Sequence, residues 1–359
     1  MKTPPLLARM LGLGQRAVLG VDLGTSALKL VELATVPAGL KVVAAQTAPI
    51  AAGAIKEGKI VDAPAVGEAL RSAVVASRSH TKNVAFAIPD AMVLNWTLEL
   101  PADLPETEME MQVLLEAEKN IPYPLDEVAL DFTTTETTAD GQAKLFVAAI
   151  RRELIDSLEE VAGQAGLTLK IVDAERFCFE RVHPLIFRHV PKSQEGQEGK
   201  DSAAPVAIMD LGAANMRFYV LEDGQLIYNR DESFEPLTQG DTPTNAADPP
   251  APQKRNDPPD SPDHRDGLNT REELIARIDH LLQTFHNSSQ KRIGQLVLCG
   301  GAALNPLVAK RTEAKINLPV VLGNPFAWLE KSERLNHKRL TAMAPFMLLA
   351  TGLALRGVH

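Results

Sequence analysis

The chain has 359 residues, a length that predicts two or more lobes rather than one ordinary domain. Its formal net charge of -9 argues against a general nucleic-acid binder, because neutralising phosphates requires clustered Lys and Arg. Aromatic residues make up only 4% of the chain, which argues against a surface on which bases stack. The two cysteines, Cys178 and Cys299, lie far apart in the sequence. We therefore expect a reducing compartment, without a disulfide framework or a thiolate metal site.

We expect no secretory signal, because the first twenty residues lack a sustained apolar core followed by a small-residue cleavage site. The longest apolar run, residues 342–355, is shorter than a bilayer span and contains Pro345 and Gly352. This run is expected to be a buried helix near the C-terminus. We therefore expect a cytoplasmic protein.

Two segments of the sequence echo one another. Residues 17–33 read AVLGVDLGTSALKLVEL, and residues 206–221 read VAIMDLGAANMRFYVL. Each segment is an apolar strand that ends in Asp-Leu-Gly, followed by a turn of small residues and a second strand. A repeat nearly two hundred residues apart indicates a duplicated lobe rather than a short-period solenoid.

The rest of the chain sorts into strands, helices and two segments of low apolar content. Apart from the hairpins, the strands are expected at 41–48, 83–88, 145–149, 169–172, 225–230 and 295–298, and the helices at 106–120, 152–166, 174–182 and 271–285. Residues 191–205 and 236–270 are polar or Pro-rich and lack periodicity. Because such segments bury too little apolar surface to offset chain entropy, we expect a flexible loop and a disordered linker there.

The first hairpin turn carries the pattern of a phosphate site. Gly24, Thr25 and Ser26 are small, so their backbone N–H groups can approach an anion closely. Asp22 is suited to a hydrated Mg²⁺, and Lys29 to offsetting phosphate charge. The alternative is an ordinary hairpin turn with a locally capping Asp. The second hairpin with the same Asp-x-Gly start favours the phosphate site.

Two further turns carry weaker signals. Asp210 and Gly212 repeat the first turn, but Ala213 and its neighbours have no hydroxyl groups. Phosphate binding by backbone amides and a turn without a ligand both stay open there. The loop Gly300-Gly301-Ala302 follows an apolar strand and precedes a helix, which lets a ribose or a flat ring lie against the backbone. Loops with two glycines are also common in α/β folds without a ligand.

Residues 116–124 read Glu-Ala-Glu-Lys-Asn-Ile-Pro-Tyr-Pro. With this specific string, the chain resembles the PilM family of type IV pilus assembly proteins over about residues 10–230 and 295–356. It implies an actin-like α/β fold, the duplicated ribonuclease-H-like fold of the ASKHA class, with the extra small subdomain of PilM and FtsA. It also implies that ATP and Mg²⁺ bind between the lobes. A groove beside the small subdomain would hold the cytoplasmic tail of the membrane protein PilN, which would keep the chain at the inner membrane.

The resemblance also assigns parts of the chain to domains. After an N-terminal extension of residues 1–16, the expected first lobe is 17–82 and 151–190, the inserted small subdomain is 83–150, and the second lobe is 206–235 and 271–359.

Carried over residue by residue, the resemblance assigns the nucleotide site. The first phosphate loop is Asp22, Gly24, Thr25, Ser26 and Lys29, the second is Asp210, Gly212 and Ala213, the nucleoside loop is Gly300, Gly301 and Ala302, and the Mg²⁺ ligands are Asp22 and Asp210. Asp173 and Glu175 fall in the segment where an actin-like ATPase positions water, but the sequence identifies no catalytic base.

One stretch departs from the family pattern. PilM-like chains continue after the strand at 225–230 with a Phe-Gly-Gly type turn and a helical subdomain that frames the nucleoside. Here Ser233-Phe234-Glu235-Pro236 and the Pro-rich segment take that place. We therefore expect a reduced second lobe, a cleft with one wall missing and a weakened affinity for nucleotide.

These features predict a scaffold of a type IV pilus or related secretion complex that binds a PilN-like tail in a nucleotide-dependent way, with little or no ATP turnover. The alternative is an active actin-like ATPase or small-molecule kinase. A filament-forming protein such as FtsA is a third possibility. It is disfavoured because only three residues follow Arg356, which leaves no room for a membrane-targeting helix.

Overall fold

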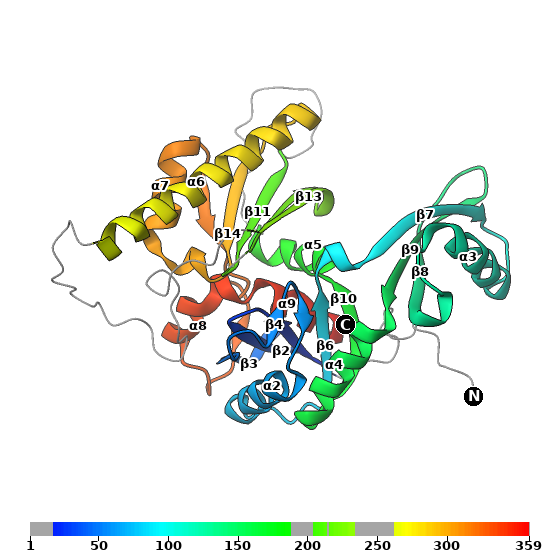
Figure 1. Cartoon of the computed structure of the whole chain (residues 1–359), viewed down its shortest axis with the longest axis horizontal. Coiled ribbons are helices and arrows are strands. Elements are labelled where there is room, and N and C mark those ends of the chain that lie inside the picture. The colour runs from blue at the N-terminus through cyan, green and yellow to red at the C-terminus, as the bar shows by residue number, and fades with distance from the viewer. Residues whose placement is uncertain (1–16, 188–203, 214, 234–261, 359) are drawn as a thin grey trace.

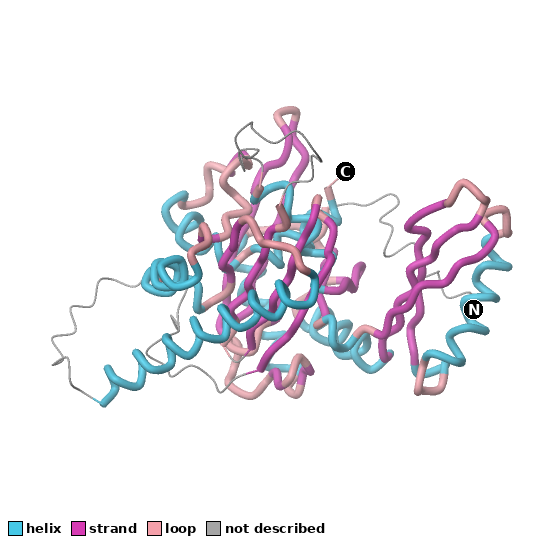
Figure 2. The backbone as a smooth tube through the Cα atoms, turned by 90° about the horizontal axis from the view of Figure 1, so that it is seen from above, coloured by secondary structure: helices cyan, strands magenta, loops and turns pink. Residues whose placement is uncertain are grey.

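The computed structural model describes residues 17–187, 204–213, 215–233 and 262–358. Figure 1 shows two lobes, each built on a β-sheet, and a small subdomain that projects to one side. Seen from above in Figure 2, the strands of the small subdomain stand apart from the sheets of the lobes.

The first lobe is built around a six-stranded sheet with the strand order β10-β6-β1-β2-β3-β16. Its strands are β1 (Leu19–Leu23), β2 (Ala27–Val36), β3 (Gly39–Pro49), β6 (Asn83–Ile88), β10 (Thr168–Ala174) and β16 (Glu330–Lys331). Helices α2 (Ala63–Ser77) and α4 (Arg152–Gln164) cover one face, and α5 (Glu175–Ile186) and α9 (Leu348–Ala354) cover the other. The short hairpin of β4 (Ile55–Lys56) and β5 (Lys59–Ile60) connects β3 to α2.

The second lobe is built around a five-stranded sheet with the strand order β13-β12-β11-β14-β15. Its strands are β11 (Val206–Leu211), β12 (Asn215–Glu222), β13 (Gln225–Ser233), β14 (Gln295–Cys299) and β15 (Val320–Leu322). Helices α6 (Pro262–Ser289) and α7 (Pro306–Ile316) pack on its outer face. The inner face packs against α5, α9 and α8 (His337–Met343) in one apolar core, and this core joins the two lobes.

The two sheets confirm the duplication that the echoed hairpins predict. In the first lobe β1 pairs antiparallel with β2 and parallel with β6; in the second, β11 pairs antiparallel with β12 and parallel with β14. The turns of the two hairpins therefore lie at equivalent edges of the two sheets. In the part of the chain that the structure describes, the connections include the 3₁₀ helices η1 (Asp90–Met92), η2 (Leu125–Glu127), η3 (Ala302–Leu304), η4 (Ala344–Phe346) and η5 (Leu355–Gly357).

The small subdomain is a three-stranded antiparallel sheet with one helix. The strands are β7 (Leu94–Pro101), β9 (Gln142–Arg151) and β8 (Val128–Thr137), and α3 (Glu106–Asn120) packs on them through Val113 and Ala117. The expected start of this subdomain at residue 83 is wrong. Residues 83–88 form β6, which is hydrogen-bonded to β1 and β10 in the main sheet and has a buried core of Val84, Ala85 and Phe86.

Two other expected boundaries differ from the structure. The end of the chain does not stay in the second lobe, because β16 pairs with β3 and α9 packs on β1 and β2 of the first lobe. The linker expected at 236–270 is contradicted at 262–270, where α6 has already begun. The rest of that linker up to residue 261, residues 1–16 and most of the loop at 191–205 lie outside the described residues.

The apolar run at 342–355 is not the single buried helix that the sequence predicts, because it contains the end of α8, then η4 and then α9. All seven residues of α9 are buried. Within the described ranges, no single helix has both the length and the apolar character of a membrane span. The stretches 337–346 and 348–357 reach that character only as a pair, which is bent by 97°.

Gly352 lets α9 pack directly on α5, and this contact yields a first prediction. A Cβ atom at this position would lie 2.2 Å from the backbone oxygen of Cys178. We expect Gly352→Ala to lower the free energy of unfolding by about 2–3 kcal/mol, because the two backbones must move apart. Urea denaturation measures this loss.

The matched control is Gly163→Ala in α4, where a Cβ would meet nothing within 4 Å. This variant is expected to be neutral or more stable by about 0.5–1 kcal/mol, because alanine favours a helix. Equal unfolding midpoints for both variants would contradict the close packing of α9.

Candidate functional site

A cleft of about 530 Å³ lies between the two lobes, and it collects the residues that the sequence singles out. From the first hairpin it is lined by Asp22, Gly24, Thr25, Ser26 and Lys29, from the second by Asp210, Gly212 and Ala213, and from the loop after β14 by Gly300 and Gly301. Ala302 is the exception, since it is only 3% exposed and packs in the core of the second lobe.

Both hairpins place an acidic residue opposite a basic one in the same register. Asp22 is the cross-strand partner of Lys29, and Asp210 is the cross-strand partner of Arg217. Lys29 Nζ lies 2.9 Å from Asp22 Oδ2, and Arg217 Nη1 lies 3.0 Å from Asp210 Oδ2. The turns match as well, because the Gly24 N–H donates to Ala27 at 3.1 Å and the Gly212 N–H donates to Asn215 at 2.8 Å.

Arg217 is therefore the second lobe's counterpart of Lys29, and sequence reasoning missed it as a site residue. The signal was present, because Lys29 follows Asp22 by the same seven positions that separate Arg217 from Asp210.

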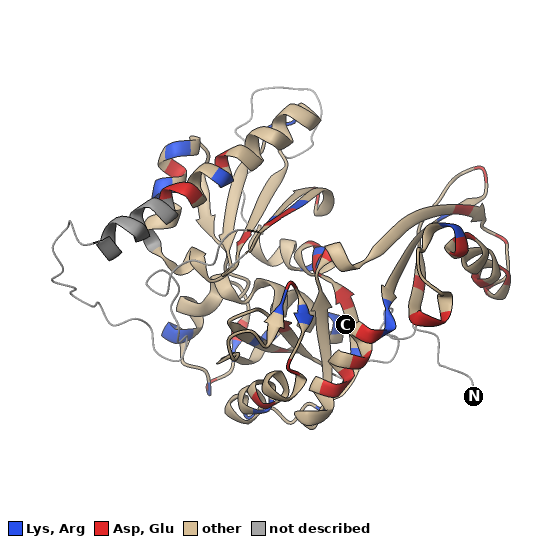
Figure 3. Ribbon diagram, in the orientation of Figure 1, with Lys and Arg blue, Asp and Glu red and all other residues tan. Residues whose placement is uncertain are grey.

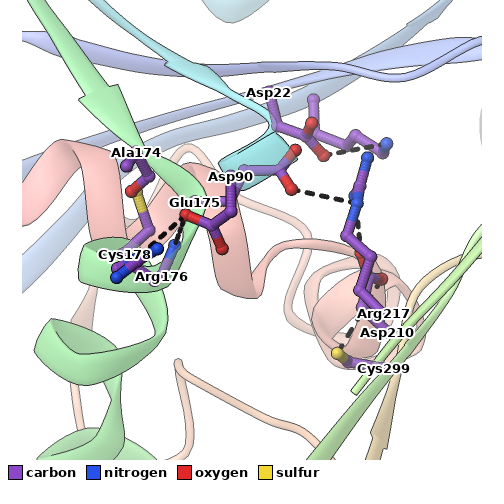
Figure 4. Close-up of polar contacts among 10 residues, drawn as sticks. Asp22, Asp90, Ala174, Glu175, Arg176, Cys178, Asp210, Arg217 and Cys299 are labelled. Atoms are coloured by element: carbon purple, nitrogen blue, oxygen red, sulfur yellow. Dashed lines mark hydrogen bonds and ion pairs between the residues drawn. The ribbon is translucent and has the colours of Figure 1, made fainter. Parts of the chain in front are cut away.

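Arg217 also joins the two lobes across the cleft, as Figure 4 shows. Its Nε lies 2.9 Å from Oε2 of Glu175, the first residue of α5 in the first lobe. The side chains of Arg217, Glu175 and Asp210 are 16%, 5% and 15% exposed. Because these charges are shielded from water, their attraction is stronger than that of a surface pair, and each depends on the others to offset desolvation.

The charges in this cluster shift one another's proton affinity. Burial raises the pKa of Glu175 above its ordinary value, the charge of Arg217 opposes this rise, and the charges of Asp22, Asp210 and Asp90 add to it. Burial alone would lower the pKa of Arg217, but Glu175 and Asp210 outweigh it and hold that pKa above its ordinary value. Arg217 therefore stays charged.

Neighbouring contacts hold the cluster in place. Asp90 of η1 lies 3.1 Å from the guanidinium Nε of Arg176, the residue after Glu175, so η1 is tied to the start of α5. Lys29 Nζ lies 4.3 Å from the ring centroid of Phe346 in η4, a cation–π contact.

The third loop approaches the second hairpin closely. Gly300 has a φ of +86°, and a Cβ atom there would lie 2.5 Å from both Asp210 Oδ1 and the backbone oxygen of Leu211. Only glycine fits this position, because it tolerates positive φ and leaves room for the neighbouring backbone. The close approach of Gly300 thus helps to set the positions of Asp210 and Gly301 in the lining of the cleft.

The residues do not fit a Mg²⁺ ion held by Asp22 and Asp210. Each of these carboxylates is already paired with a cation of the protein itself. No group of three or more His, Cys, Asp or Glu side chains within the described ranges is arranged to hold a metal ion. Of the two acids in the water-positioning segment, Glu175 lines the cleft, while Asp173 lies outside its lining and pairs with Arg181.

A second hollow, of about 190 Å³, lies where the small subdomain joins the first lobe; we call it the subdomain groove. Its lining is Lys59, Ala91, Met92, Leu94, Tyr123, Val128, Ala149, Ile150, Arg151, Glu153 and Leu154. Tyr123 is 41% exposed, and the Arg151 guanidinium lies 5.1 Å from its ring centroid. Ala91, Met92 and Leu154 line both the subdomain groove and the cleft, so the two hollows share a wall.

Comparisons with known proteins agree with this geometry. The family described as "Type IV pilus assembly protein PilM" matches residues 20–358. The fold is similar to that of a solved PilM-PilN type IV pilus biogenesis complex, with 23% identity over 96% of this chain and 99% of that chain and a TM-score of 0.71. It is also similar to the ethanolamine utilization protein EutJ from Carboxydothermus hydrogenoformans, with 13% identity over 98% of this chain and 95% of that chain and a TM-score of 0.51. The expected actin-like α/β fold is confirmed.

The buried pairs of Arg217 yield a second prediction. Arg217→Met is expected to lower the free energy of unfolding by about 3 kcal/mol, because Glu175 and Asp210 lose the cation that offsets their burial. Adding Glu175→Gln and Asp210→Asn to the same chain should recover much of this loss. Urea denaturation of the single and triple variants measures both effects.

An exposed pair supplies the control. Arg277 pairs with Glu273 on the surface of α6, with side chains 36% and 63% exposed. Arg277→Met should cost less than about 0.5 kcal/mol. If it costs as much as Arg217→Met, the cleft cluster has no special role in stability.

Proposed function

The chain belongs to the PilM family of type IV pilus assembly proteins, and from that membership we propose that it is a cytoplasmic scaffold of a type IV pilus or related secretion complex at the inner membrane. It holds the cytoplasmic N-terminal tail of a PilN-like membrane protein, and this partner keeps it at the membrane. The observation that carries the proposal is the subdomain groove. The similarity to a PilM solved together with PilN supports it.

The subdomain groove has the chemistry of a peptide site. Apolar side chains such as Met92, Leu94 and Leu154 line it, while Lys59 and Arg151 supply polar ends. Tyr123 offers a large, half-exposed ring at the rim, and aromatic and arginine side chains dominate the energetics of such interfaces. A short extended segment with one or two apolar side chains fits a hollow of this size.

The surroundings of the groove are acidic. Figure 3 marks Asp and Glu residues along α4, which lines the groove with Glu153 and Leu154, and along α3 of the small subdomain. These are Glu153, Asp156, Glu159 and Glu160 on α4 and Glu106, Glu108, Glu110, Glu116 and Glu118 on α3. The charge favours a tail that carries Lys or Arg beside its apolar anchors and speeds the approach of such a tail.

The cleft makes tail binding nucleotide-dependent in this proposal. Glycine-rich turns from both lobes converge on a cavity within the size range of small-molecule sites. Met92 and Leu154 face both hollows, so a ligand that moves η1 or α4 in the cleft changes the groove. Between β13 and β14 the structure describes the side chains of residues 272–294, and none of these lines the cleft. We propose that the nucleotide site is weak.

An active ATPase or small-molecule kinase is the less favoured function. Such an enzyme needs an acid or base within reach of the attacking oxygen. Glu175 is the candidate in the cleft, and its carboxyl group is engaged by Arg217. We propose that turnover is slow or absent.

The scaffold function predicts that groove variants lose the tail. A peptide with the N-terminal tail of the PilN-like partner should bind the wild-type chain, and Tyr123→Ala should weaken binding about tenfold, which corresponds to about 1.4 kcal/mol. Fluorescence anisotropy, with and without ATP, measures both Kd values.

The control is Met111→Ala on α3. This side chain is 61% exposed and belongs to the same subdomain but does not line the groove, so its loss should leave the Kd unchanged. Absence of tail binding by the wild-type chain in every nucleotide state would overturn the proposal. So would equal losses for the two variants.

A further inference from the structure

We propose that the cleft binds the phosphates of its nucleotide with Lys29 and Arg217 as the cations, so that binding requires no divalent metal ion. This inference rests on the nucleotide site of the proposed function and concerns how that site neutralises its ligand.

The two cations occupy equivalent places in the duplicated fold. Each lies opposite the Asp of its hairpin, one on each side of the cleft, and both line it. The small residues Gly24, Thr25, Gly212 and Ala213 leave the turns beside them open to an anion. A phosphate chain between the lobes therefore meets a cation from either side.

The ion pairs already formed in the cleft disfavour a Mg²⁺ ion bound directly to Asp22 and Asp210. A Mg²⁺ ion bound to Asp22 and Asp210 would have to displace Lys29 and Arg217 from side chains that are only 10–16% exposed, which would separate two shielded ion pairs. Phosphate oxygens instead add acceptors for cations that are already in place. Arg217 has the planar fork that binds phosphate oxygens in pairs, and charge-assisted bonds of this kind are strong.

Glu175 competes with the phosphate for Arg217. Arg217 Nε lies 2.9 Å from Glu175 Oε2, so a phosphate that draws the guanidinium group toward itself weakens the ion pair between the lobes. Phosphate binding and the interlobe contact are thus alternatives at one guanidinium group. Removing the charge of Glu175 should leave Arg217 more available to phosphate.

The test is calorimetric titration of the full chain with ATP, once in excess EDTA and once in excess MgCl₂. We expect binding in EDTA to be at least as tight as in MgCl₂. A loss of affinity of about tenfold or more on removal of Mg²⁺ would overturn the inference and leave the nucleotide site standing. Absence of binding in both buffers would overturn the inference together with the nucleotide part of the proposed function, while tail binding is measured separately.

Two variants test the roles of the side chains. Arg217→Gln should weaken binding in EDTA about tenfold or more and should make it depend on Mg²⁺, because Asp210 is then free to bind a metal ion. Glu175→Gln should tighten binding in EDTA.

A third variant is the control. Arg217→Lys keeps the charge and should bind ATP more tightly than Arg217→Gln, which separates loss of charge from loss of structure. An unchanged Kd for Arg217→Gln in both buffers would contradict the assignment.

Discussion

Arg217 forms the ion pairs on which the geometry of the cleft depends. It extends from the second lobe to Asp210 on its own hairpin and to Glu175 at the start of α5 in the first lobe. A buried cation with two acidic partners is costly to disturb, because removal of any member leaves the others without compensation. The side chain that ties the second hairpin to α5 of the first lobe is therefore the same one that offers a cation to the cleft.

A line of contacts leads from this cluster to the subdomain groove. Glu175 and Arg176 are consecutive residues of α5, and Arg176 holds Asp90 of η1. The last residue of η1, Met92, lines both hollows. A change in the contacts of Arg217 can thus reach the groove through one rigid helix end and one short 3₁₀ helix. We therefore expect nucleotide binding and tail binding to be coupled through these contacts.

Much of the cleft could be predicted from the sequence because the fold is duplicated. The two Asp-Leu-Gly hairpins each specify a strand, a tight turn and a returning strand within a few residues, and the sheets place them as equivalents. Arg217 was missed because it lies on the returning strand, beyond the small residues of the turn that carry the phosphate pattern. Its true counterpart is Lys29. Ala302 was assigned to the cleft by its glycine neighbours, but the turn of η3 directs it into the core.

The errors in the domain boundaries arise from contacts between distant residues. The sequence of β6 predicts a buried strand but not its neighbours, and the return of the chain from the second lobe to α9 in the first leaves no local signal. The start of α6 was misassigned for another reason. The Pro- and Asp-rich composition around it suggested a linker, while Ser261-Pro262 is also a pattern that begins helices.

The measurement that tests the scaffold function most directly is hydrogen exchange of the full chain with and without the tail peptide of the PilN-like partner. We predict slower exchange in the segments that form the subdomain groove, at 91–94, 123–128 and 149–154, and unchanged exchange in the first turns of α3 at 106–111. Saturating peptide that leaves the groove segments unprotected, or that protects a different surface, would contradict this account.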